Sequence, residues 1–434
     1  MNYTEIFKKY ALSVPDILLP RDKTDLSRWA VIACDQFTQD RGYWKKAEEY
    51  AGKDPSTLSL ILPEVYLEDD GRAERLNQIR TTMKEYLGKA GVFAESVHGF
   101  MYIERKTAYG RTRKGLVAAI DLDAYDWKPD SKALIRATEA TIIDRIPPRM
   151  EIRRGAPIES PHIMLLVNDK NKKLVEGTGT RVNKAQPLYD TPLMLDSGSI
   201  SGWSVSSEAD LSYIADTVSA LARTNTATDG NCLLFAVGDG NHSLATAKAV
   251  WDEFRKDNDN LDTHPARFAL VEIVNLYDSG LTFEPIHRVL FGTDEPTLSA
   301  YLTSHLGGTM HTASSGEELD GIVAEKDTTR FGFVSSGKYS WLDTPDPALA
   351  VSRLQPVLDA FIEKHPSVKI DYIHGNEEVF RLGKEVNTVS ILLPPVEKDS
   401  FFTTIESNGP LPRKSFSMGE ASEKRFYIEC RKLF

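Results

Sequence analysis

The residues with the clearest chemical potential lie at one junction, in the stretch "LLFAVGDGNHSLATAKAVWDEF" at residues 233–254. An apolar run typical of a buried strand ends there, and an amphipathic run typical of a helix begins. Gly238 and Gly240 flank Asp239, and glycine permits a tight turn and a close approach of the backbone to a bound group. The pattern is neither a P-loop nor a complete GxGxxG fingerprint.

The first helical turn after the junction is a candidate anion site. Its backbone N–H groups have no partner inside the helix, and the helix dipole is positive there, so a phosphate or carboxylate is favoured. Asp239 is suited to bind a metal or take a proton from a hydroxyl, and His242 to carry a proton near neutral pH. We therefore expect Asp239 and His242 to be catalytic, and Gly240, Asn241 and Ser243 to bind phosphate. A purely structural turn remains the alternative, because these residue types also make turns and N-caps.

A second set of candidates lies in the arginine-rich stretch "IRATEATIIDRIPPRMEIRR". Arg136 and Glu139 stand one helical turn apart if the segment is helical. Glu139 is then a candidate catalytic base or metal-orienting carboxylate, and Arg136 is a candidate to bind an anionic substrate. Arg145 and Arg149 are candidates for a phosphate cradle, since guanidinium groups bind phosphate in two-point contacts. A solvated ion pair and a solvated charged face are the corresponding structural alternatives.

Other candidates are more isolated. His287 and Arg288 end the stretch "FEPIHR" and are expected either to reach the same cleft or, for His287, to be a core histidine. Cys34 and Asp35 follow an apolar run, where sites in α/β proteins commonly lie, but the sequence shows no base beside Cys34. The tail contains cations that either close over an anion or form a basic surface: Lys414, Lys424 and Arg425. The remaining histidines have no metal-ligand spacing, so no metal site is predicted.

Composition limits the functional classes. The 434 residues are 41% hydrophobic and 26% charged, with a formal net charge of −11, as in a soluble globular protein longer than one domain. This acidity argues against wholesale binding to nucleic acid or a membrane surface, and no apolar run has the roughly 18 residues that a span requires. The three cysteines indicate neither a disulfide framework nor a CxxC metal site. We expect a cytoplasmic protein, and the oligomeric state stays open.

Strand-like and helix-like segments alternate along the chain, which predicts an α/β or α+β fold of several units. We expect an N-terminal α/β unit at 1–128, a core unit carrying GDGNHS at 129–292, and a C-terminal α+β unit at 293–434. Residues 72–90 are predicted to form a helix that stops at Gly91, and Ser207 is predicted to cap another helix.

Four stretches together resemble a known family: "ACDQFTQDRGYW", "RATEATIIDRI", "GDGNHSLATAK" and "PIHRVL". In this order they are similar to motifs of a family of bacterial and archaeal proteins called domain of unknown function 1015 (DUF1015), over residues of about 15 to 290. The family's motif is in turn similar to one in the ParB and sulfiredoxin superfamily, where a turn at a helix N-terminus holds nucleotide phosphates. The resemblance implies a central mixed-sheet domain of ParB/sulfiredoxin type.

The same resemblance implies a phosphorylated small-molecule ligand or nucleotide as partner. That superfamily includes free serine kinases, so the first functional expectation is an enzyme that phosphorylates a serine-like hydroxyl, using Mg²⁺ with ATP, ADP or pyrophosphate. The alternatives are a non-catalytic module that senses a nucleotide or phosphorylated metabolite, and a phosphatase, although no DxDx[TV] nucleophile motif is present. Ser243 stands where the family usually has a cationic or histidine residue. Arg145, Arg149 or Arg288 would then have to supply the missing positive charge.

Overall fold

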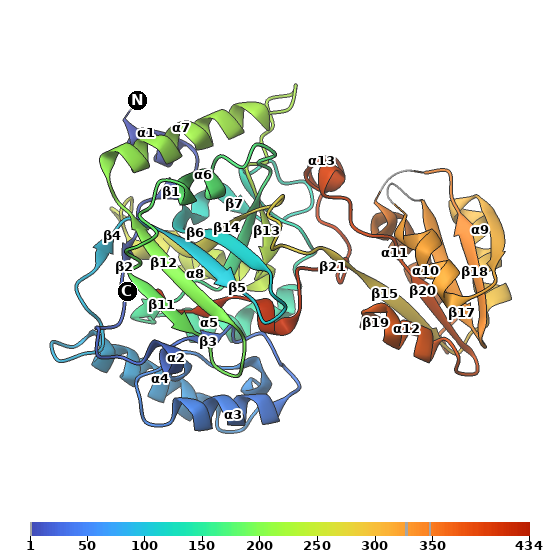
Figure 1. Ribbon diagram of the computed structural model, residues 1–434, viewed down its shortest axis with the longest axis horizontal. Helices are drawn as coiled ribbons and strands as arrows, with labels where there is room; N and C mark the ends of the chain where they lie inside the picture. Colours follow the sequence, from blue (N-terminus) through green and yellow to red (C-terminus); the bar gives the residue numbers. More distant parts are fainter. Residues whose placement is uncertain (1, 326–328, 347–348) are drawn as a thin grey trace. The chain divides into compact units, whose positions relative to one another are not determined.

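The chain folds into two compact units, each with its own β-sheet (Figure 1). The computed structural model describes residues 2–325, 329–346 and 349–434. The first unit comprises Met1–Leu281 together with Glu420–Phe434, and the second comprises Thr282–Gly419. Both combine helices with strands, so the expected mixed α/β class is confirmed.

Ten of the described strands of the first unit form one mixed sheet. Nine of them lie in the order β11 (Tyr189–Pro192), β12 (Ser199–Val205), β5 (Phe100–Lys106), β6 (Thr112–Asp121), β14 (Phe268–Asn275), β10 (Ile163–Val167), β13 (Phe235–Asp239), β8 (Ile135–Ala137) and β7 (Tyr125–Asp126). The tenth, β1 (Leu12–Ser13), pairs with β6. β10 runs parallel to β14, and β8 runs parallel to both β13 and β7, whereas the other neighbours are antiparallel. The β10 strand is buried along its whole length, as the continuous apolar run "IMLLV" requires.

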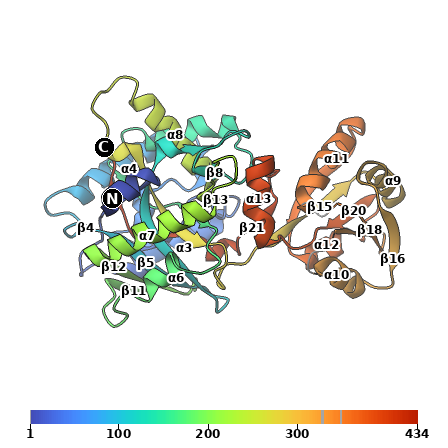
Figure 2. The ribbon, with the colours of Figure 1, turned by 90° about the horizontal axis from the view of Figure 1, so that it is seen from above.

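Helices cover both faces of this sheet. The first unit contains α1 (Tyr3–Lys9), α2 (Leu26–Trp29), α3 (Arg41–Ala51), α4 (Arg72–Leu87), α5 (Ile146–Arg153), α6 (Val175–Gly179), α7 (Glu208–Thr224) and α8 (Asn241–Phe254). Figures 1 and 2 show α7 beside α1 along one side of the sheet, and Figure 1 shows α5 and α8 on the other. Ser207 caps α7 by accepting from the Asp210 N–H, as predicted. The helix predicted at 72–90 ends earlier, at Leu87, where Gly88 follows.

The units divide the chain differently from the three expected segments. The border expected after residue 128 falls inside the larger sheet, where β6 pairs with β14 and β7 pairs with β8. The expected C-terminal segment is split, because the last residues return to the first unit. There β22 (Phe426–Tyr427) pairs with β3 (Val31–Ile32), and β23 (Arg431–Lys432) pairs with β9 (Ile158–Glu159). Strand pairing across distant segments satisfies backbone groups that separate units would leave exposed.

The second unit contains an antiparallel sheet between two pairs of helices (Figure 2). The strand order is β16 (Thr309–Ala313), β18 (Lys338–Asp343), β17 (Arg330–Ser335), β20 (Thr388–Leu392), β15 (Glu284–Phe291) and β19 (Lys369–His374), with β21 (Phe416–Ser417) also pairing with β15. The helices are α9 (Glu295–Leu306), α10 (Gly316–Ala324), α11 (Ala350–Lys364), α12 (Asn376–Leu382) and α13 (Lys398–Asn408). Side chains of α10 and α12 pack on β17 and β20 in one cluster of buried apolar residues.

A helix that crosses a membrane must be both long and apolar. None in the described part of the chain combines the length and the apolar character that a membrane span needs.

Candidate functional site

The turn between β13 and α8 is shaped by a β-bulge followed by a left-handed glycine. Val237 pairs with Leu165 and Asp239 with Met164, so Gly238 is an extra residue between the two pairs. Gly240 then adopts φ +82° and forms the N-cap of α8 without any side-chain cap. The bulge and the glycine together turn the chain sharply from the end of β13 into the first turn of α8.

Gly240 is required here for two independent reasons. Its left-handed φ is a conformation that side chains with a Cβ rarely adopt. A Cβ at this position would also lie 3.0 Å from the His162 ring and 3.2 Å from the Ile163 Cα. The His162 imidazole therefore packs directly against the turn, close to the positive end of the helix.

A second segment, residues 138–142, lies along the first turn of α8. Asn241 Oδ1 accepts from the Thr138 N–H at 3.3 Å, and His242 Nε2 accepts from the Ile142 N–H at 3.2 Å. Glu139 therefore belongs to the short stretch between these two contacts, and the structure brings that stretch to the predicted turn. Because Nε2 of His242 accepts a hydrogen bond, the proton of the neutral ring is on Nδ1 in this arrangement.

The start of α8 retains hydrogen-bonding capacity. The backbone N–H groups of Asn241 and Ser243 have no acceptor among the residues that the structure describes. The Ser243 hydroxyl likewise makes no hydrogen bond within this described set, and its side chain is partly exposed. These donors, with the helix dipole, are suited to an anion.

Lys424 contacts the turn from the C-terminal segment. Its Nζ lies 3.4 Å from Asp239 Oδ2, and its side chain is only 11% exposed. Asp239 also accepts from the Gly240 N–H at 3.1 Å, so its carboxylate is held at the end of β13. The positive charge of Lys424 also helps to lower the pKa of Asp35, so Lys424 stabilises the charged form of a second carboxylate. The junction thus combines a carboxylate, an ammonium group and free backbone donors.

Asp35 and His162 form an ion pair beside this junction. Asp35 Oδ2 lies 3.0 Å from His162 Nε2, and the other ring nitrogen lies 2.5 Å from the Tyr427 hydroxyl. Asp35 follows β3, His162 precedes β10, and Tyr427 ends β22, so three distant segments meet. The Cys34 Sγ lies 4.0 Å from His162 Nδ1, a neighbour of the thiol that the sequence did not show.

This pair is held in its charged form. Burial alone lowers the pKa of His162, but the Asp35 carboxylate and Tyr427 outweigh it and raise the pKa well above its ordinary value. Burial would also raise the pKa of Asp35, but the charge and hydrogen bond of His162 lower it overall. At neutral pH, His162 is therefore a cation and Asp35 an anion.

The four predicted residues of the arginine-rich stretch have different surroundings. Arg136 lies in β8 rather than in a helix, and it donates to the Ala133 carbonyl and to Asn231, away from the turn. Arg149 is paired with Glu64, to which its Nε donates at 2.9 Å. Both guanidinium groups are therefore engaged by the protein.

Arg145 differs from these two arginines. It ends the 3₁₀ turn Ile143–Arg145, three residues after the contact between Ile142 and His242. It is exposed, and its side chain has no hydrogen-bond or ion-pair partner among the described residues. Of the three arginines expected to replace the missing charge, Arg145 is the one near the turn whose guanidinium remains open.

His287 and Arg288 belong to the second unit, where the structure uses both within the interior. His287 Nε2 contacts Asn376 Oδ1 at 2.6 Å, and its Nδ1 accepts from the Leu393 N–H at 3.0 Å. Burial lowers the pKa of His287 to about 4. The Arg288 Nε donates to Gln355 at 2.9 Å, and Nη1 donates to the Lys414 carbonyl at 2.9 Å. His287 is therefore a hydrogen-bonded core histidine, which is one of the two alternatives expected from the sequence.

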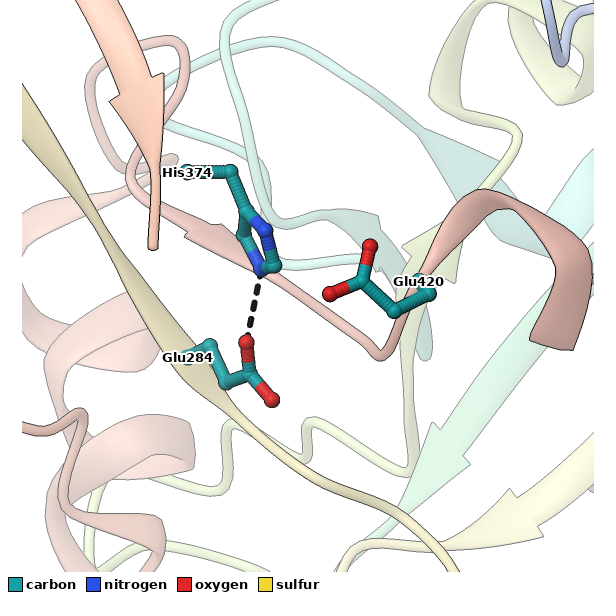
Figure 3. A group of neighbouring side chains, drawn as sticks. All are labelled: Glu284, His374 and Glu420. Atoms are coloured by element: carbon teal, nitrogen blue, oxygen red, sulfur yellow. Dashed lines mark ion pairs between the residues drawn. The ribbon is translucent and has the colours of Figure 1, made fainter. Parts of the chain in front are cut away.

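The same unit contains a partly buried pair on β15 and β19. His374 Nε2 lies 2.7 Å from Glu284 Oε2 (Figure 3). The two strands are neighbours in the antiparallel sheet, and their register brings these ends together. The pair is thus a cross-strand contact at one end of the smaller sheet.

The sequence did not indicate His162 as a site residue, and it left Lys424 open between closing over an anion and forming a basic surface. A signal was present: Asp35 follows an apolar run, His162 precedes the run "IMLLV", and Asp239 ends another run. Polar residues at the ends of buried strands are candidates for one site when those strands are neighbours. The sequence does not tell which strands are neighbours in the sheet. In the structure β10 pairs antiparallel with β13, and this pairing brings His162 beside the end of β13.

The similarities to solved structures are distant, and they include the following three. A mutant free serine kinase in complex with ADP matches at 10% identity and a TM-score of 0.38, covering 73% of this chain and 92% of that one. A conserved hypothetical protein from Pyrococcus furiosus matches at 11% and 0.35, covering 73% and 95%. C-terminally truncated SbnI from Staphylococcus aureus matches at 8% and 0.36, covering 70% and 82%. At TM-scores below 0.5 these similarities carry no argument about the fold or ligands of this chain.

Comparison with curated proteins gives no match to the chain. A family model does match: the family described as "Protein of unknown function (DUF1015)" covers residues 17–361. This range is more than half of the 434 residues and includes both the turn at Gly240 and the segment at Asp35. The chain belongs to the DUF1015 family.

Proposed function

We propose that this chain is an enzyme of small-molecule metabolism that binds the phosphates of a nucleotide or pyrophosphate at the first turn of α8. It transfers a phosphoryl group to a serine-like hydroxyl. One observation carries the proposal: the turn opens α8 directly beside two cationic side chains, Lys424 and His162. Backbone N–H groups at a helix start and nearby cations are together the chemistry that binds phosphate.

Other side chains supply the positive charge toward phosphate that Ser243 lacks. Lys424 and the His162 imidazolium flank the turn, and Arg145 is exposed three residues beyond Ile142. Lys424 is at present paired with Asp239 and His162 with Asp35, so the site without ligand is close to neutral. Addition of a phosphate anion favours rearrangement of these pairs toward the ligand.

The reaction follows the usual course of phosphoryl transfer. The acceptor oxygen forms a bond to the terminal phosphorus, the bond from that phosphorus to the bridging oxygen breaks, and the remaining phosphate leaves with that oxygen. The acceptor proton passes to a carboxylate, for which Asp239 at the turn and Glu139 in the adjacent segment are the candidates. Asp239 and Asp35 offer the oxygen ligands that Mg²⁺ prefers, and bound Mg²⁺ would neutralise phosphate charge.

The test combines binding with turnover. Titration calorimetry with pyrophosphate and ADP, with and without Mg²⁺, is run on the wild-type protein, Lys424→Met and Lys432→Met. Lys432 is exposed on the same C-terminal segment and serves as the matched control. We expect Lys424→Met to weaken pyrophosphate binding at least about tenfold, since a partly buried charged contact is worth 1.4 kcal/mol or more. Lys432→Met should bind as the wild type does.

Turnover is then measured as phosphoserine formed from serine with ATP, ADP or pyrophosphate as donor. Phosphoserine formation that is lost in Lys424→Met supports the proposed kinase activity. Tight binding that depends on Lys424 without turnover of any hydroxyl compound would indicate the sensing module instead. If neither pyrophosphate nor ADP binds, the turn is structural and the proposal is wrong.

A further inference from the structure

A second feature of the first unit is an open cavity of about 400 Å³. This volume lies within the range of pockets that hold cofactor-sized ligands. Its lining comes from three separate segments: Phe37, Asp40, Gly42, Tyr43 and Lys46; Leu195, Asp196 and Ser197; and Ser422. None of these residues belongs to the turn at Gly240, so the cavity is a separate structural element.

One wall of the cavity is aromatic and flat. The rings of Phe37 and Tyr43 stack with centroids 3.8 Å apart and an interplanar angle of 12°. Each ring of a stacked pair has one face covered by its partner, so the pair presents a rigid planar surface. A planar ring system is the ligand part that such a wall recognises.

The backbone around the cavity is held in uncommon conformations. Nine non-glycine residues in the described part of the chain have a positive φ, and three of them line this cavity: Phe37, Leu195 and Asp196. Left-handed non-glycine residues cost free energy and are retained where the surrounding structure fixes them, often at ligand sites. Their concentration at one cavity singles it out from the rest of the surface.

Several polar groups at the cavity have no protein partner. The Asp196 carboxylate and the Lys46 ammonium group are exposed and make no ion pair with any described residue. Tyr43 Oη and Arg105 Nε are buried atoms without a hydrogen-bond partner in the described chain, and Arg105 is fully buried. Arg105 reaches this cavity wall through Nη2, which donates to the Ser422 carbonyl at 3.0 Å.

The cavity is next to the phosphate site along two chain segments. Phe37 is two residues after Asp35, and Ser422 is two residues before Lys424. Residues two apart have Cα atoms separated by at most about 7 Å. Asp35 and Lys424 are the side chains already placed beside the turn at Asp239. A single ligand of nucleotide length can therefore contact both places.

We propose that this cavity holds the nucleoside part of the nucleotide whose phosphates bind at the first turn of α8. The base lies against the Phe37–Tyr43 wall, and the Asp196 carboxylate accepts from ribose hydroxyls, the role that acidic residues play toward ribose in other nucleotide sites. Two carboxylates, Asp40 and Asp196, line the cavity against one ammonium group, Lys46, so phosphate is less favoured in the cavity than beside Lys424, and the charges orient the ligand. The inference rests on the proposed function for the phosphate end, but the cavity itself is tested separately.

The experiment measures each part of the ligand alone. Titration calorimetry with adenosine, ADP and pyrophosphate is run on the wild-type protein, Asp196→Asn and Asp216→Asn. Asp216 is an exposed aspartate on α7 and is the matched control. We expect Asp196→Asn to weaken adenosine and ADP binding about tenfold and to leave pyrophosphate binding unchanged. Phe37→Ala should act in the same direction, while Lys424→Met should weaken pyrophosphate and ADP but not adenosine.

The outcomes separate the two proposals. If pyrophosphate binds through Lys424 but adenosine does not bind, or ADP binds no tighter than pyrophosphate, the nucleoside assignment is overturned and the phosphate site stands. If Asp196→Asn and Phe37→Ala bind adenosine as the wild type does, the cavity is not its site. If adenosine binds through Asp196 but neither pyrophosphate nor ADP depends on Lys424, the phosphate site fails instead.

Discussion

Two regions predicted to handle phosphate differ in how the fold uses their charged side chains. At the first turn of α8, backbone donors remain open, and Arg145 is exposed without a partner among the described residues. On β15 of the second unit, His287 is 3% exposed and Arg288 is fully buried, and both are bonded to groups of their own unit. From the sequence, residues of both regions are candidates for binding a phosphate.

The two regions have similar residue types, but their cationic side chains differ in whether the protein itself provides their hydrogen-bond partners. A buried cation that donates to carbonyl and amide oxygens of its own unit stabilises the fold, and its removal leaves buried acceptors unsatisfied. A cation at an exposed helix start keeps its donors for a ligand. The first region should therefore respond to mutation mainly in binding, and the second mainly in stability.

The largest effect is expected from Arg288→Ala. Loss of its bonds to Gln355 and to two carbonyls should lower the free energy of unfolding of the second unit by about 4 kcal/mol. Hydrogen exchange of peptides from β15 and β20 measures this locally. Pyrophosphate binding under folding conditions should not change. Selective loss of pyrophosphate binding without faster exchange would mean that the two regions are not distinct in this way.

The second prediction concerns pH and His287. Its folded-state pKa of about 4 lies below the ordinary value of 6.5, so the unfolded chain binds the proton more strongly. The stability contribution is fully present above pH 6.5 and is lost as pH falls toward 4. It amounts to about 3 kcal/mol, at about 1.4 kcal/mol per pH unit. Urea unfolding between pH 4 and 7 measures it. An unchanged pH dependence in His287→Gln would contradict the assignment.

Gly240→Ala is expected to have an intermediate effect on stability and a large one on binding. The left-handed φ and the contacts with His162 and Ile163 should together cost about 2 kcal/mol. Gly230→Ala is the matched control, because Gly230 has φ +81° with no atom within 4 Å of its Cβ position. It should cost about 1 kcal/mol and leave pyrophosphate binding intact. Equal effects of the two variants on binding would argue against a ligand at the turn.

The smallest effect is expected from Arg145→Ala. Because Arg145 is exposed and its side chain makes no hydrogen bond or ion pair with the described residues, the free energy of unfolding should change by less than about 0.5 kcal/mol. Pyrophosphate affinity should fall about fivefold, equivalent to about 1 kcal/mol. Arg413, an exposed arginine of the second unit, provides the control as Arg413→Ala. Identical affinities of the two variants would remove Arg145 from the site.

Local features were predictable where neighbouring residues determine them. The strand before Gly238, the helix that begins at Asn241 and the cap at Ser207 all follow from apolar spacing and capping chemistry. The segment around Arg136 was harder, because a short buried strand and a helical turn have similar patterns there. The border at residue 128 failed because strand pairing between β6 and β14 is not encoded in local spacing.

The sequence by itself determined the chemistry at the turn: two glycines, a carboxylate and a helix start with open donors. Only the tertiary structure decided which other charges join it. Asp35, His162 and Lys424 are separated by more than a hundred residues from one another, yet β3, β10 and β22 bring them beside β13. The physical reason is that burial of apolar strands fixes their order in the sheet, and that order alone sets which polar strand ends become neighbours.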